Sequence, residues 1–236
     1  MNIRSYTGNY IDVVFFDLFY TLITPAYPDS GREYELLGIS ESEWESYAED
    51  DELFRRRATG RERDPHRIIE AIVEKMRVSV DASVIREIAG RREERMKRAM
   101  MEVDPVILDE LSILKNLGFR LCLITNADTI DVMHWEASPL RPLFDNAVIS
   151  CEVGHMKPKR EIYHIACDRA HVKPENSIFV GDGGSDELRG AREAGMKTIL
   201  TEHLLTREPD QRKRIKGYAS FAADDFRDIR RILTGQ

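Results

Sequence analysis

The chain has few cysteines, no long apolar run and no excess of positive charge. Its three cysteines, Cys122, Cys151 and Cys167, are odd in number and widely spaced, which argues against a disulfide framework and fits a reduced, cytoplasmic setting. No run of roughly 18 apolar residues and no charged-then-apolar N-terminus is present, so we expect neither a membrane span nor a signal peptide. The net charge of −7 gives no support for nucleic-acid binding.

What the sequence does contain is an alternation of strand and helix patterns. The chain has 236 residues, 42% of them hydrophobic, enough for a core domain with a smaller insertion. Short apolar runs predict strands at 11–16, 119–124, 146–150, 177–180 and 196–200. Helical patterns at 105–117, 159–171 and 186–194 precede the second, fourth and fifth of these runs. This order predicts an α/β fold with a parallel sheet and right-handed crossovers.

The segment between the first two predicted strands is the exception. Residues 25–103 are far too many for a loop and carry helical patterns at 41–57, 65–77 and 82–100. We therefore expect an inserted all-helical unit at 25–103 and a core made of 1–24 and 104–236. The final segment, 203–236, is expected to be a charged connector followed by a short amphipathic helix.

Polar residues follow three of the predicted strands. Asp17 comes after the first, Thr125-Asn126 after the second, and Asp182 and Asp186 after the run 177–180. Open parallel sheets bind their ligands at the carboxyl ends of their strands. A carboxylate such as Asp17 can act as a nucleophile, and three carboxylates make a hard oxygen site suited to Mg²⁺. Turn formation and helix capping are alternative roles for Asp17 and Asp186.

Thr21 lies four residues after Asp17, and Lys157 precedes Pro158. The Thr21 hydroxyl is expected to position its loop, although an ordinary turn role is nearly as compatible with the spacing. A fixed ammonium at Lys157 would offset repulsion between carboxylates and a phosphoryl group, and the Thr125 hydroxyl would bind an oxyanion.

Taken in order, Asp17, Thr125, Lys157 and the loop Gly181–Asp186 resemble the haloacid dehalogenase superfamily. The resemblance implies a Rossmann-like core and a helical cap, inserted at 25–103, that closes over the active site and selects the substrate. It also implies Asp17 as nucleophile, Asp17, Asp182, Asp186 and the Phe19 carbonyl as Mg²⁺ ligands, and Thr21, Thr125, Asn126 and Lys157 around the phosphoryl group.

One motif departs from the family pattern. Family phosphatases carry a second Asp two residues after the nucleophile, usually followed by Gly-Thr, whereas this chain has Phe19 and Tyr20. Phenylalanine cannot transfer a proton, and general acid–base catalysis is worth about 10²–10⁴-fold. The dehalogenase branch also has an aromatic residue there, but it tends to have Ser-Ser-Asn in the fourth motif, where this chain has Gly-Asp-Gly.

We therefore expect a Mg²⁺-dependent hydrolase that acts on a small phosphorylated metabolite. A 2-haloacid dehalogenase, with Asp17 displacing halide, is one alternative, and a non-catalytic protein that binds a phosphorylated ligand or a partner is another.

The arginine-rich segment 55–67 follows an acidic one, and most of its side chains are expected to be solvated and charge-compensated. One or two of these arginines would reach a substrate anion. The sequence does not indicate the substrate or the oligomeric state.

Overall fold

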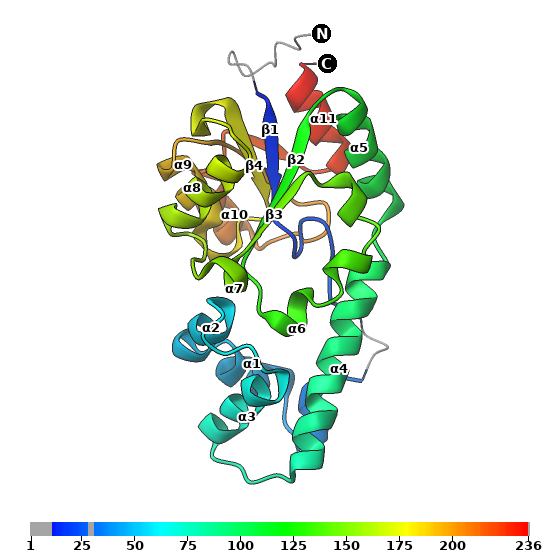
Figure 1. Cartoon of the computed structure of the whole chain (residues 1–236), viewed down its shortest axis with the longest axis vertical. Coiled ribbons are helices and arrows are strands. Elements are labelled where there is room, and N and C mark those ends of the chain that lie inside the picture. Colours follow the sequence, from blue (N-terminus) through cyan, green and yellow to red (C-terminus); the bar gives the residue numbers. More distant parts are fainter. Residues whose placement is uncertain (1–10, 28–30, 236) are drawn as a thin grey trace.

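The computed structural model describes residues 11–27 and 31–235, which fold around a six-stranded parallel sheet (Figure 1). The strands have the order β3-β2-β1-β4-β5-β6. They are β1 (Val13–Phe16), β2 (Arg120–Thr125), β3 (Asn146–Ile149), β4 (Ser177–Gly181), β5 (Lys197–Thr201) and β6 (Phe221–Ala223). All neighbouring pairs are parallel, which confirms the predicted Rossmann-like α/β fold.

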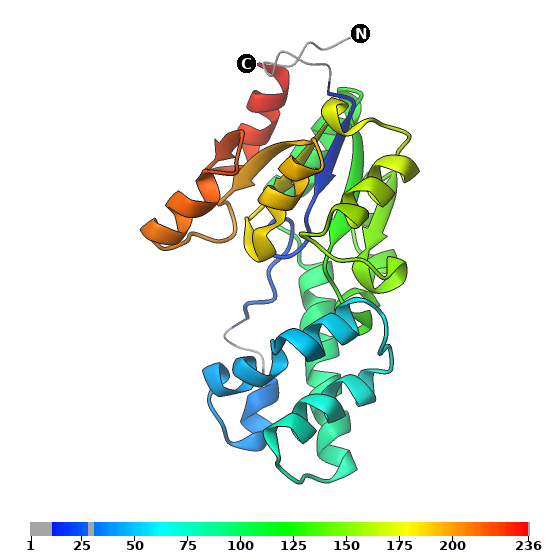
Figure 2. The same ribbon diagram turned by 90° about the vertical axis from the view of Figure 1, so that its left-hand side faces the viewer.

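The sheet is buried on both faces by helices. Helices α5 (Pro105–Asn116) and α11 (Phe226–Thr234) cover one face, and α8 (Arg160–Arg169), α9 (Glu187–Glu193) and α10 (Pro209–Lys216) cover the other (Figures 1 and 2). In β1, Val14 and Phe16 belong to the hydrophobic cluster under α5 and α11, whereas Val13 and Phe15 belong to the cluster under α8 and α9. A strand buried on both faces reads as a continuous apolar run, so this strand was predictable.

Between β1 and β2 the chain forms a group of helices with its own hydrophobic cluster. We call residues 31–101 the helical insert; it contains α1 (Glu41–Ala48), α2 (Asp51–Ala58), α3 (Pro65–Met76) and α4 (Ala82–Met101). Ile69, Ile72 and Ile88 form its centre. The insert lies at the end of the sheet toward which the strands run (Figures 1 and 2).

Two expectations about the elements need correction. The helix expected over 41–57 is two helices, because the Asp50 carboxylate accepts hydrogen bonds from the N–H groups of Glu52 and Leu53 and starts α2 there. The segment expected to be only a connector and a helix also contains α10 and β6. Strand β6 has three residues at the sheet edge, two of them only half-buried, and so gives a weak sequence pattern.

The remaining elements are short. They are α6 (Thr129–Val132), α7 (Ser150–Val153) and 3₁₀ turns at Glu33–Leu37, Trp135–Ala137, Arg141–Leu143, Pro174–Asn176 and Gly184–Asp186. Within the ranges that the structure describes, no helix is both long and apolar enough to cross a membrane.

Candidate active site

Three adjacent strands bring the predicted site residues to one edge of the sheet. Asp17 follows β1, Thr125 ends β2 and Asp182 follows β4, and these strands are neighbours in the order β2-β1-β4. The Asp17 N–H donates to the Val180 carbonyl at 2.9 Å, which fixes the Asp17 backbone against the end of β4. The carboxyl ends of parallel strands are where open α/β sheets bind ligands.

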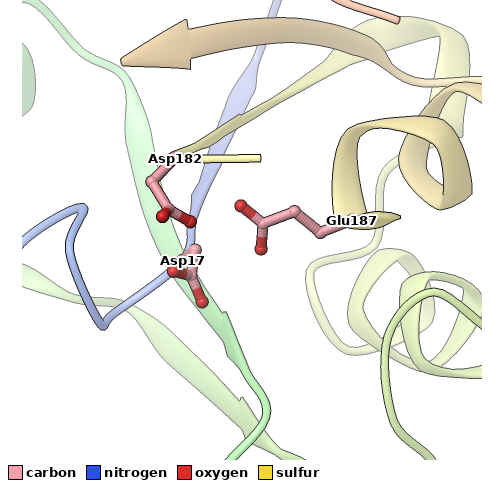
Figure 3. A group of neighbouring side chains, drawn as sticks. All are labelled: Asp17, Asp182 and Glu187. Atoms are coloured by element: carbon pink, nitrogen blue, oxygen red, sulfur yellow. The ribbon is translucent and has the colours of Figure 1, made fainter. Parts of the chain in front are cut away.

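Three buried carboxylates converge at this edge (Figure 3). One oxygen each from Asp17, Asp182 and Glu187 lies within 4.8 Å of the others, and the residues are only 5%, 5% and 2% exposed. Burial, together with the charge of Asp17, raises the pKa of Asp182 and raises the pKa of Glu187 well above its usual range. Such a set of hard oxygen donors, whose mutual repulsion a cation would relieve, fits Mg²⁺.

Lys157 supplies a positive charge to this cluster. Its Nζ donates to Glu187 Oε2 at 2.6 Å and is also hydrogen-bonded to Asp17 Oδ1. Burial would lower the pKa of Lys157, but the carboxylates of Asp17 and Glu187 outweigh burial and raise the pKa, so the ammonium stays charged. Lys157 therefore partly neutralises the carboxylates that surround the expected nucleophile.

Thr21 links the loops that follow β1 and β4. Its hydroxyl donates to Asp17 Oδ2 at 3.2 Å and accepts from the Asp182 N–H at 3.0 Å. Gly181 makes room for the third carboxylate, because a Cβ there would lie 2.1 Å from Glu187 Oε1. The Thr21 hydroxyl thus links Asp17 to Asp182, and the absence of a side chain at Gly181 lets Glu187 approach these two residues.

Thr125 and Asn126 differ in what they contact. The Asn126 amide accepts from the Lys157 N–H at 2.7 Å and donates to the Lys157 carbonyl at 2.9 Å, so it holds the Lys157 backbone in place. The Thr125 hydroxyl is fully buried and has no hydrogen-bond partner within the described residues. A buried polar atom without a partner is costly unless a ligand or a water molecule satisfies it.

The structure does not bring Asp186 into the carboxylate cluster. Its side chain is 50% exposed and pairs with Arg189 at 3.2 Å, and its backbone has a left-handed φ of 52°. The next residue, Glu187, begins α9, lies near Asp17 and Asp182, and accepts from the Gly183 N–H at 3.0 Å. The prediction that Asp186 belongs to the carboxylate cluster was therefore wrong, and the adjacent Glu187 takes its place. Only the backbone geometry distinguishes these two acids.

Arg207 is a second residue that sequence reasoning missed. It lies between β5 and α10, and its Nε donates to the Asp182 carbonyl at 3.0 Å. Its Nη2 is hydrogen-bonded to the Asp182 carboxylate. No motif surrounds Arg207 in the sequence, so only the fold connects it with Asp182.

The loop after Asp17 turns two aromatic residues toward a cavity. Phe19 pairs with Ile23 in an isolated bridge, and the Tyr20 N–H donates to the Ile23 carbonyl at 2.6 Å. Tyr20 has a φ of 58°, a left-handed conformation that favours glycine. Burial raises the pKa of the Tyr20 phenol, so it stays protonated at neutral pH and can donate a hydrogen bond but cannot act as a base.

The cavity has a volume of about 460 Å³ and lies between the strand ends and the helical insert. Asp17, Lys157, Asp182 and Glu187 lie on its core side. The insert contributes a mixed wall that includes Arg32, Glu41, Trp44, Glu45, Glu49, Phe54, Arg57, Arg92 and Arg95. A cavity of this size, with charged groups gathered at one end, is typical of a small-molecule site.

A parallel sheet with a lysine-bridged carboxylate cluster at its carboxyl edge is suited to a hydrolase active site, and the similarity of the chain to known proteins agrees with this class. The chain belongs to the haloacid dehalogenase-like hydrolases, whose family profile matches residues 11–195. It is 30% identical over 141 residues to a glyceraldehyde 3-phosphate phosphatase of Methanothermobacter thermautotrophicus. That match spans 58% of this chain and 62% of the relative, so it covers less than two thirds of the relative's length.

Solved structures share the fold. A haloacid dehalogenase family enzyme of Bacteroides thetaiotaomicron, in complex with magnesium and inorganic phosphate, superposes with a TM-score of 0.63 at 20% identity. The match covers 85% of this chain and 98% of that one. A 2-haloacid dehalogenase from Pseudomonas syringae superposes with a TM-score of 0.65 at 22% identity, over 94% of this chain and 97% of its own.

Proposed function

We propose that this hydrolase is a Mg²⁺-dependent phosphatase acting on a small phosphorylated metabolite through an aspartyl-phosphate at Asp17. The observation that carries the proposal is the convergence of Asp17, Asp182 and Glu187 around Lys157 at the base of the cavity. Displacement of halide does not need a cluster of this kind, whereas a phosphoryl group bound through a cation does. The likeness to a glyceraldehyde 3-phosphate phosphatase supports the same substrate class.

Each residue has a role in this proposal. The carboxylates of Asp17, Asp182 and Glu187, with the Phe19 carbonyl, would hold Mg²⁺, which when bound neutralises charge on the transferring phosphoryl group. The Thr125 hydroxyl and the Lys157 ammonium would bind phosphoryl oxygens. Asn126 and Thr21 would act indirectly, by holding Lys157 and Asp17 in position.

The reaction takes two displacements at phosphorus. An Asp17 carboxylate oxygen attacks the phosphorus, the bond from phosphorus to the alcohol oxygen breaks, and that oxygen takes a proton from water, which leaves hydroxide. A water molecule then attacks the phosphorus of the aspartyl-phosphate, and the bond from phosphorus to the Asp17 oxygen breaks. The proton that this water loses neutralises the hydroxide from the first step, and the products are inorganic phosphate and the regenerated carboxylate. The helical insert, for which the sequence predicts the bounds 25–103, would act as a cap that closes the cavity during both steps.

Phe19 makes the first displacement depend on the leaving group. The Phe19 side chain cannot protonate the departing oxygen, so phosphate esters whose alcohols leave readily should react faster than alkyl phosphates. The second displacement lacks the base that would activate water, so the aspartyl-phosphate should accumulate. Equal rates across leaving groups, without a detectable intermediate, would contradict this proposal.

The direct test is hydrolysis of p-nitrophenyl phosphate with Mg²⁺ and with EDTA, using Asp17→Asn as the inactive control. The nitrophenolate leaving group needs no acid, so Phe19 does not mask a competent site. Mg²⁺-dependent release that Asp17→Asn abolishes is the expected result. No release under either condition would refute phosphoryl transfer.

Dehalogenation is the second candidate, and one observation favours it. Phe19 lines the cavity beside Asp17, where the dehalogenase branch of the family also has an aromatic residue. Chloride release from 2-chloropropionate that persists in EDTA and disappears in Asp17→Asn would establish this activity. Absence of both activities would leave a protein that binds its ligand without turnover.

A further inference from the structure

The arginines of the helical insert that line the cavity are already paired with carboxylates. Arg95 donates to Glu33 Oε1 through Nε at 3.1 Å and Nη2 at 2.6 Å, and Glu33 is only 2% exposed. Arg92 Nη2 lies 2.7 Å from both Asp128 Oδ2 and Asp131 Oδ1. These two guanidinium groups bind buried acids and are not available as simple receptors for a substrate anion.

The other two arginines are also occupied. Arg57 is 4% exposed, donates to the Ala48 carbonyl at 2.6 Å and to Glu49 at 2.8 Å, and its Nε lies 3.0 Å from Asp128 Oδ2. Arg32 is paired with Glu41. The expectation that arginines of the segment 55–67 are mostly solvated therefore does not apply to Arg57, which is part of the wall.

One carboxylate on the same wall has no such partner. Glu41 and Glu45 of α1, and Glu49 directly after it, are spaced four residues apart, which puts them on one side of the helix, and all three line the cavity. Glu41 and Glu49 pair with Arg32 and Arg57. No hydrogen bond or ion pair of the Glu45 carboxylate is present within the described ranges 11–27 and 31–235.

We propose that Glu45 is a specificity residue that selects phosphate monoesters with an uncharged or cationic alcohol part. The proposal rests on the proposed phosphatase function, because it assumes that the phosphoryl group occupies the Asp17–Lys157 end of the cavity. The alcohol part then extends toward the insert, where the paired charges cancel and Glu45 remains. A carboxylate or second phosphate there meets repulsion, whereas hydroxyl and ammonium groups find an acceptor.

The aromatic residues that line the cavity favour phosphate monoesters whose alcohol part is cationic. Trp44 precedes Glu45, and Tyr20 also lines the cavity. The Phe54 ring is already covered by the Arg57 guanidinium, which lies 4.8 Å from its centroid. The faces of aromatic rings attract ammonium groups, and most strongly so for Trp. The site therefore offers a hydroxyl or ammonium group both an anionic acceptor and apolar surface for the carbon chain.

Three probes of nearly equal size separate these possibilities. They are 2-hydroxyethyl phosphate, O-phosphoethanolamine and 2-phosphoglycolate, whose second groups are neutral, cationic and anionic. Binding is measured by titration calorimetry in the presence of Mg²⁺ on the Asp17→Asn protein, so the result does not depend on turnover. We expect the cationic and neutral probes to bind more tightly than phosphoglycolate.

The matched variants are Glu45→Gln and Glu43→Gln, each added to Asp17→Asn. Both remove one negative charge from α1, but Glu43 does not line the cavity. Glu45→Gln should lower the ratio of the Kd for phosphoglycolate to the Kd for phosphoethanolamine by about fivefold, the size expected for one solvent-exposed charge. Glu43→Gln should leave the preference unchanged.

Each outcome is decisive. Tightest binding of phosphoglycolate, or equal effects of the two variants, would overturn the role of Glu45. Binding of inorganic phosphate without binding of any of the three probes would also overturn it, while leaving the proposed phosphoryl site intact. Failure of the unsubstituted protein to bind even inorganic phosphate with Mg²⁺ would refute the proposed function and this inference with it.

Discussion

Replacing Phe19 by aspartate tests whether this chain lacks only a proton donor. Phe19 lies two residues after Asp17 and lines the cavity, so a carboxylic acid there would lie near the leaving oxygen. General acid catalysis is worth about 10²–10⁴-fold, which corresponds to about 3–5 kcal/mol of transition-state stabilisation. Phe19 is half-buried against the cluster under α5 and α11, so the substitution also loses packing. We therefore expect a gain at the lower end of this range, about a hundredfold in kcat/KM for alkyl phosphates.

The assay compares kcat/KM for ethyl phosphate and p-nitrophenyl phosphate in Phe19→Asp and Phe19→Asn. Asparagine has the size of aspartate and causes the same loss of packing, but it cannot donate a proton as an acid. The ratio kcat/KM reports the first displacement and is not affected by slow hydrolysis of the aspartyl-phosphate. Phe19→Asp should exceed Phe19→Asn about a hundredfold on ethyl phosphate and far less on p-nitrophenyl phosphate. Equal rates of the two variants on ethyl phosphate would refute the reasoning.

Four further predictions concern the metal site, the insert and the thiols. Glu187→Gln should weaken Mg²⁺ binding at least tenfold in titration calorimetry (about 1.4 kcal/mol), whereas Asp186→Asn, which changes the half-exposed neighbour, should bind like the parent. Arg207→Gln should instead tighten Mg²⁺ binding, since its guanidinium holds one of the three carboxylates; unchanged or weaker binding would count against this competition. Arg92→Ala should lower the free energy of unfolding by about 3–5 kcal/mol in urea titrations, because it removes the ion-pair partner of Asp131 and one of the two partners of buried Asp128. Burial raises the pKa of the Cys122 thiol to about 12, so iodoacetamide at pH 8 should modify it only after unfolding.

The parts of the fold that sequence reasoning recovered are those in which burial leaves a strong pattern. The strand before Asp17 is apolar throughout because both of its faces are covered, and helix α5 shows helical spacing closed by Gly118. Strand β6 lacks such a pattern because it is short and lies at the sheet edge. The break between α1 and α2 depends on one capping side chain, Asp50, within a uniformly charged segment.

The candidate site was predictable only as far as motifs mark it. Asp17 and Asp182 follow strand signals, Lys157 is marked by the Pro158 after it, and the structure brings the three together. The choice between Asp186 and Glu187 depends on where α9 begins and on a left-handed turn, which sequence does not specify to one residue. Arg207 reaches the site through tertiary structure alone, from a connector without a pattern.

Covalent phosphorylation of Asp17 is the step on which the proposed function depends, and peptide mass spectrometry detects it. The protein is mixed with p-nitrophenyl phosphate and Mg²⁺, quenched in acid within the first turnover, digested and sequenced. We expect one phosphoryl group on the peptide that contains Asp17, and none in Asp17→Asn or in the EDTA control. Release of nitrophenol without any phosphorylated peptide, or with the phosphoryl group on another residue, would rule out Asp17 as the nucleophile.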